Sequence, residues 1–304
     1  MWHYDDSRAA MRDALRLSRA MTYKSAVAGL PLGGGKGVIM LPATVDPRLR
    51  RAALRDFGDT VEQLGGAYIT AEDVGTSAKD MEAIAERTKY VTGLSRKRGG
   101  SGDPSPWTAL GVEASIRASL ERKLGSESPK GRTVVVNGLG HVGFALAKLL
   151  AKAGAKLIVS DIDRSKKALA ERLGARWISP SKTLTTAADV LAPCALGGIL
   201  DHESVPKLQV PIVAGAANNQ LADDPIADLL ADRGILWAPD FVANAGGIIN
   251  ISVELERGGY DRDRARVKVN GIGDTMREIF DLAHHDGDTP FSAALALASR
   301  RVRE

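Results

Sequence analysis

Apolar residues recur at helical spacing in two stretches near the start of the chain, at residues 5–21 and 47–64. Ser77 and Asp80 have the spacing of a helix cap, which predicts a third helix over residues 77–88. Short apolar runs bounded by glycine or proline predict strands at residues 25–29, 37–41 and 67–71. Helices and strands therefore alternate in this first part, as in an α/β layer.

A break rich in glycine and proline at residues 99–106 separates the first part from the rest. We place a domain boundary there and expect an α/β fold with a cleft between two domains. The expected domains are a substrate domain at 1–103, a Rossmann-type doubly wound dinucleotide domain at 104–285, and a terminal helix at 286–304 that returns to the first domain. Patterns in the second part predict helices at residues 107–124, from the glycine turn at 138–143 to residue 153, and from residue 290 onwards. They also predict strands at 133–137, 156–161, 189–191, 210–214 and 235–237.

The turn after the predicted strand 133–137 carries the glycine pattern of a dinucleotide-binding unit. In this pattern the first glycine allows a tight turn, the second lets backbone amides reach a pyrophosphate, and the third packs helix against strand. Asp161 ends the next strand 18 residues after the last glycine, and its carboxylate suits ribose hydroxyls but repels a 2′-phosphate. NAD is therefore favoured over NADP, with a purely structural glycine turn as the alternative. The turn consists of Gly138, Leu139, Gly140, His141, Val142 and Gly143.

Lys36 lies in a run of glycines, residues 31–37, that leaves room for a small molecule beside it. A nucleoside triphosphate loop is unlike this run, because that motif needs glycine where Leu30 stands and Ser or Thr in place of Gly37.

Lys24 and Asp73 also lie beside strand-end or glycine-rich sequence. Two neighbouring ammonium groups repel, so one loses its proton more readily and can act as a base, while an adjacent acid can move a proton. Structural roles stay open for both residues: a solvated cation at a helix end for Lys24 and a turn acid for Asp73.

Composition narrows the classes of function. The chain has 304 residues and a net charge of +4, and no apolar stretch reaches the roughly 18 residues that span a bilayer. Its start does not resemble a signal peptide, so we expect a cytoplasmic protein with no membrane partner. Aromatic residues, at 5%, do not interleave with the basic clusters, so we expect no nucleic-acid partner. The single cysteine, Cys194, and the scattered histidines predict no disulfide and no metal site.

Further motifs follow one another along the chain at residues 22–24, 31–37, 70–75, 105–112, 138–143, 215–220 and 244–250. In this order they resemble the motifs of the glutamate/leucine/phenylalanine/valine dehydrogenases, a family of amino-acid dehydrogenases. The resemblance covers essentially the whole chain. The chain is most similar to the leucine, valine and phenylalanine branch of this family, because it is compact and ends soon after the cofactor domain.

The resemblance implies reversible oxidative deamination of leucine, valine or isoleucine to a 2-oxo acid and ammonia, with NAD as cofactor. It implies that Lys24 binds the substrate carboxylate, that Lys36 activates the water, and that Asp73 moves protons. Asn218 would lie where the nicotinamide ribose and the substrate meet. The implied cofactor contacts are Thr108, the turn 138–143, Asp161, Ala195, Leu196 and Asn218. The implied side-chain pocket is Ala71, Ile248 and Ile251, and such an apolar set disfavours glutamate.

The chain begins inside what the family has as a continuous first domain. We therefore expect that either the recorded start lies too late or the chain is shortened. A homo-oligomer is expected where the full N-terminal segment is present. Two rival interpretations stay open: a phenylalanine or glutamate dehydrogenase, and a truncated, non-catalytic NAD-binding relative.

Overall fold

The computed structural model describes residues 1–42 and 46–303. Within them, the larger sheet has six parallel strands in the spatial order β5-β4-β3-β6-β7-β8. Counted from β3, this is the strand order of a Rossmann sheet, so the predicted fold class is confirmed. The strands are β3 (Thr133–Asn137), β4 (Lys156–Ser160), β5 (Arg176–Trp177), β6 (Val190–Pro193), β7 (Ile212–Val213) and β8 (Leu236–Trp237).

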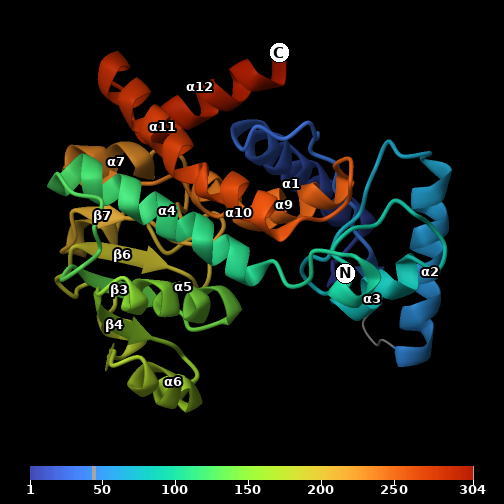
Figure 1. Ribbon diagram of the computed structural model, residues 1–304, viewed down its shortest axis with the longest axis horizontal. Coiled ribbons are helices and arrows are strands. Elements are labelled where there is room, and N and C mark those ends of the chain that lie inside the picture. The colour runs from blue at the N-terminus through green and yellow to red at the C-terminus, as the bar shows by residue number, and fades with distance from the viewer. Residues whose placement is uncertain (43–45, 304) are drawn as a thin grey trace.

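Both faces of this sheet are covered. Val134 and Val136 belong to one buried cluster and Val135 to another, as alternating side chains of a central strand require. In Figure 1, α4 lies above the strands and extends past them, with α11 and α12 farther up in the same view. The helices are α4 (Ser105–Leu124), α5 (His141–Lys152), α6 (Lys167–Arg172), α7 (Ile226–Asp232), α8 (Asp240–Ala243), α9 (Gly246–Ser252), α10 (Arg262–Asn270), α11 (Ile272–Asp286) and α12 (Pro290–Arg303).

The first part has less regular structure. It contains α1 (Ser7–Val27), α2 (Pro47–Gln63) and α3 (Ala78–Ile84), and the two-residue parallel strands β1 (Trp2–His3) and β2 (Met40–Leu41). In Figure 1, α2 and α3 lie at the side of the molecule opposite the larger sheet. A small core of its own joins α2 to α3 and the segment after it, through Leu54, Met81, Ala83, Ile84 and Val91.

The predicted helices of the first part are confirmed, including the cap at Ser77, but the strand prediction at 25–29 is wrong. Residues 25–27 are the last turn of α1, where Ala26 and Val27 join the core that contains α12. Apolar packing against helices, rather than against a sheet, explains that run. Of the strand predicted at 37–41, only the two residues of β2 are in a strand. The strand predicted at 67–71 is reduced to one isolated β-bridge between Thr70 and Val91.

The end of the chain returns to its beginning. Helix α12 packs against α1 and α11, and Arg301 Nη1 donates a hydrogen bond to Val27 O (2.6 Å). Among the described residues, no helix has the length and apolar character to cross a membrane.

Candidate active site

Lys36 lies in the loop between α1 and β2, and its ammonium forms an ion pair with the Asp73 carboxylate. Its side chain is 19% exposed and that of Asp73 is 51% exposed. Burial raises the pKa of the Asp73 carboxyl, but the charge and hydrogen bond of Lys36 outweigh burial and hold that pKa below its ordinary 3.8. Asp73 is thus a carboxylate that faces a lysine, which is an arrangement suited to proton transfer.

The glycines of the lysine loop make room mainly for the protein itself. A β-carbon on Gly35 would stand 2.6 Å from the Tyr68 ring, and one on Gly37 would stand 2.8 Å from the Phe57 ring. Gly37 N also donates to Tyr68 Oη (3.0 Å). Gly33, by contrast, has nothing within 4 Å of such a carbon. The expectation that the whole run stays open to a substrate therefore holds only at Gly33.

Lys24, in the last turn of α1, lies beside the second part of the molecule. Its Nζ lies 3.3 Å from Asn218 Oδ1, which also accepts a hydrogen bond from Asn244 Nδ2 (2.8 Å). Burial lowers the pKa of Lys24 below its ordinary 10.5, against the attraction of Asp240 and Asp73. The fold therefore brings Lys24 and Asn218 together and places Lys24 within electrostatic reach of Asp73.

Asp240 is a buried acid beneath this site that the sequence interpretation missed. Its Oδ2 accepts a hydrogen bond from Gln220 N (2.7 Å), and burial raises its pKa above the ordinary 3.8. The Gln220 side chain, fully buried, bonds Gly215 O, Ala217 O and Trp237 Nε1, so this network holds the loop that carries Asn218. The signal available in the sequence was the position of Asp240, which follows the strand Leu236–Trp237 after Ala238 and Pro239.

The turn after β3 has the geometry of a phosphate-binding turn. Gly138 has φ +99°, which favours glycine, and a β-carbon on Gly143 would strike Gly138 O. Gly140 caps α5 without a side-chain hydrogen bond, and nothing lies within 4 Å of its missing β-carbon. His141 and Val142 begin the helix, while Leu139 is buried. The first-turn amides of α5 thus start a helix next to open space, where an anion is stabilised.

Asp161, at the end of β4, is 8% exposed. Its carboxylate accepts hydrogen bonds from Leu139 N (2.7 Å), Asp163 N (2.8 Å) and Lys166 Nζ (2.9 Å). Burial raises the pKa of Asp161, but these donors outweigh it and hold the pKa below 3.8. Lys166, five residues further along the chain, is the cation at this acid, and sequence reasoning did not single it out. A carboxylate has about four acceptor sites, and three donors are described for Asp161.

The other proposed contacts lie around this turn and at the start of α4. A β-carbon on Gly138 would stand 2.9 Å from Ala195, and Leu196 beside it is 81% exposed. Thr108 lies in the first turn of α4, where its Oγ1 donates to Pro104 O (3.2 Å).

Of the proposed pocket residues, Ile248 and Ile251 are half-buried and lie three positions apart on α9, so they share one side of that helix. Ala71, also half-buried, follows the Thr70–Val91 bridge and lies two residues before Asp73.

Comparison with known proteins gives matches along most of the chain. Residues 2–90 match the family described as Glu/Leu/Phe/Val dehydrogenase, dimerisation domain, and residues 158–304 match Glutamate/Leucine/Phenylalanine/Valine dehydrogenase. Residues 112–197 match the NAD binding domain of D-isomer specific 2-hydroxyacid dehydrogenases.

Individual relatives align over nearly the full chain. The leucine dehydrogenase of Thermoactinomyces intermedius is 46% identical, over 99% of this chain and 82% of the relative. The valine dehydrogenase of Streptomyces virginiae is 42% identical, over 99% and 84%. The crystal structure of L-tryptophan dehydrogenase from Nostoc punctiforme superposes with a TM-score of 0.86 at 41% identity, and the match covers 99% of this chain and 85% of that one. The hetero-hexameric glutamate dehydrogenase from Thermus thermophilus gives a TM-score of 0.78 at 25% identity, over 95% and 77%.

Proposed function

The chain belongs to the Glu/Leu/Phe/Val dehydrogenase family, and we propose that it catalyses the NAD-dependent oxidative deamination of a branched-chain L-amino acid. In this reaction Cα loses a hydride and the nitrogen loses a proton, so the amine becomes an imine. Water then adds to the imine carbon, and the nitrogen leaves as ammonia. When bound, NAD supplies the hydride acceptor. The relatives named leucine and valine dehydrogenase support this activity.

The residues of the Rossmann turn fit that cofactor. Gly138, Gly140 and Gly143 leave the start of α5 free of side chains, where its amides and helix dipole would hold the pyrophosphate. Asp161 would orient the adenosine ribose, and Thr108, Ala195 and Leu196 would contact the rest of the cofactor. His141 and Val142 would present the first amides of the helix.

On the substrate, Lys24 would bind the carboxylate, and Asn218 would orient the same end next to the nicotinamide ribose. Once Asp73 has accepted the proton of the Lys36 ammonium, Lys36 as a neutral amine would take the proton of the attacking water. Asp73 would then pass the proton it holds to the substrate nitrogen. Proton exchange without bulk water is supported by the direct contact between the two side chains. Ala71, Ile248 and Ile251 would line the apolar pocket for the substrate side chain.

The observation that carries this proposal is the convergence of Lys36 with Asp73 and of Lys24 with Asn218, from segments far apart in the chain. The test is NADH formation with leucine, valine, isoleucine, phenylalanine, tryptophan and glutamate, with NAD binding measured separately. We expect the highest kcat/KM for a branched-chain substrate. A preference for an aromatic amino acid or glutamate would overturn the substrate class, and NAD binding without turnover on any of them would overturn the activity.

We also propose that the protein acts in the cytoplasm as a homo-oligomer. Large apolar side chains stand exposed on α1 and α2, among them Met11 at 64%, Leu15 at 67% and Leu49 at 65%. Met11 and Leu15 lie four positions apart, on one side of α1. An apolar pair exposed side by side supports an interface on that helix. Light scattering in solution tests this, and a monomer at working concentration would contradict it.

A further inference from the structure

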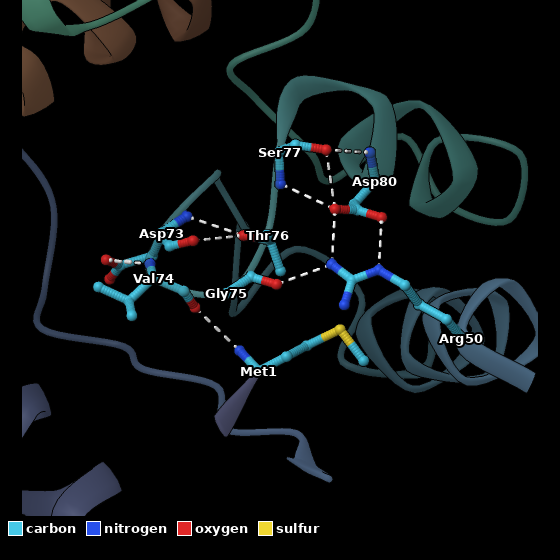
Figure 2. Close-up of polar contacts among 8 residues, drawn as sticks. All are labelled: Met1, Arg50, Asp73, Val74, Gly75, Thr76, Ser77 and Asp80. Atoms are coloured by element: carbon cyan, nitrogen blue, oxygen red, sulfur yellow. Dashed lines mark hydrogen bonds and ion pairs between the residues drawn. The ribbon is translucent and has the colours of Figure 1, made fainter. Parts of the chain in front are cut away.

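Arg50, on α2, reaches the turn that carries Asp73, although its own element is remote from that turn in the sequence (Figure 2). Its Nη2 donates to Gly75 O (2.7 Å) and to Asp80 Oδ2 (2.8 Å), and its Nε donates to Asp80 Oδ1 (3.1 Å). One planar guanidinium therefore joins α2, the turn and the start of α3. Lysine has a single ammonium and cannot reproduce this fork.

Besides pairing with Arg50, Asp80 also caps the start of α3. Its Oδ2 accepts hydrogen bonds from Ser77 N (2.9 Å) and Ser77 Oγ (2.8 Å), which closes the capping box of α3. The Asp80 side chain is only 15% exposed, so the adjacent Arg50 guanidinium is needed to stabilise its negative charge. The ion pair thus fixes the point at which α3 begins, directly after the turn.

Within the turn, Thr76 Oγ1 donates to Asp73 O (2.7 Å) and accepts from Asp73 N (3.0 Å), while Val74 N donates to Asp73 Oδ1 (2.7 Å) (Figure 2). Gly75 has φ +79°, a conformation that few other residues adopt. Because the peptide that Arg50 holds lies two residues from Asp73, movement of Gly75 would displace the carboxylate.

We propose that the Arg50–Asp80 pair is a positioning element that holds the turn 73–76 so that the Asp73 carboxylate meets Lys36. The proposal rests on the function proposed above, in which Asp73 takes part in proton transfer. Misplacement of a reacting group by about 1 Å can cost about a hundredfold in rate.

The chain offers a matched control in Arg87, which makes the same kind of forked pair with Asp59 of α2. Arg87 Nε lies 2.7 Å from Asp59 Oδ1 and Nη2 lies 2.9 Å from Asp59 Oδ2. This pair also links α2 to the segment around α3, and the hydrogen bonds described for Arg87 go to Asp59, not to the turn. It therefore reports what a surface ion pair between these elements contributes when its described hydrogen bonds do not reach residues 73–76.

The experiment compares Arg50→Lys with Arg87→Lys in the full chain. For Arg50→Lys we expect kcat to fall about 10- to 100-fold, with the KM for NAD unchanged. The acid limb of the pH–rate profile should move to higher pH, because a looser Asp73–Lys36 pair raises the pKa of Asp73. Amide exchange in residues 70–77, followed by mass spectrometry, should quicken. Arg87→Lys should leave all three measurements at wild-type values.

Equal behaviour of the two variants, in rate and in exchange, would overturn the positioning role. If the wild type shows no turnover, the proposed function fails, and the exchange measurement alone still decides whether Arg50 holds the turn. Should Arg50→Lys not fold, Asp80→Asn replaces it, since it keeps the side-chain volume but removes the negative charge that pairs with Arg50. Wild-type exchange in residues 70–77 of that variant would also overturn the proposal.

Discussion

The turn after β3 and the loop that carries Lys36 are both rich in glycine, but the glycines have different causes. In the turn, Gly138 needs a positive φ and Gly143 must approach Gly138 O, so the main constraint lies among neighbours in the sequence, with Ala195 as the contact from a distant segment. In the lysine loop, Gly35 and Gly37 yield space to Tyr68 and Phe57, which come from distant segments. The turn is therefore specified largely by its own backbone, whereas the lysine loop is specified by contacts between segments that are far apart.

The largest expected effect is a loss of catalytic rate from a change in the first part of the molecule, while NAD binding by the second part stays unchanged. Lys36→Ala should lower kcat by about a thousandfold, because the proton acceptor is lost, while the Kd for NAD stays unchanged. Steady-state rates and cofactor titration measure the two effects. Asp161→Ala is the reverse control, with weaker NAD binding and near-normal turnover at saturating NAD. A Lys36→Ala enzyme with wild-type turnover would refute the assignment of the base.

A core truncation tests whether the two parts are stabilised separately. Leu54, 1% exposed, belongs to the small core of the first part, and Leu54→Ala should cost about 3 kcal/mol of local stability. Amide exchange should then quicken in residues 47–94 while β3 and β4 keep their protection. Leu146→Ala, in the large core, is the contrasting variant and should destabilise the sheet. Equal loss of protection in both parts after Leu54→Ala would show one cooperative unit.

A smaller effect concerns acid stability in the second part. The pKa of Asp161 is lower in the folded protein than its ordinary 3.8, so its charge stabilises the fold above that value. This contribution is lost as the pH falls through the lowered pKa. Asp161→Asn should therefore be less stable than wild type at pH 7 by about 1–2 kcal/mol, and the difference should shrink below about pH 4. Urea unfolding across this range measures it, and a difference that grows in acid would contradict the sign.

Several parts of the fold could be predicted because their causes are local. The three valines of β3 and the Ser77–Asp80 cap each act within a few residues, and both stand where the sequence indicated. The run at residues 25–27 misled the strand prediction, since a short apolar run buries equally well in a helix or a strand and only α12 decides which. Lys166 could not be singled out, because an isolated charged residue has no periodicity to signal its partner. Asp240 follows a strand and Pro239, but nothing in the sequence indicates that it accepts a hydrogen bond from Gln220.

The dinucleotide turn, the order of helices and strands around it and the family resemblance follow from local patterns in the amino-acid chain, and the same patterns indicate Lys24, Lys36 and Asp73 as candidate residues. Which side chains meet is known only from the tertiary structure. Lys36 pairs with Asp73, and Lys24 lies beside Asn218. Arg50 donates a hydrogen bond to Gly75 O, in the turn that carries Asp73. The physical reason is range. Backbone conformation and apolar periodicity act over a few neighbouring residues, whereas an ion pair between loops exists only after the packing of α1, α2 and α3 has brought those loops together.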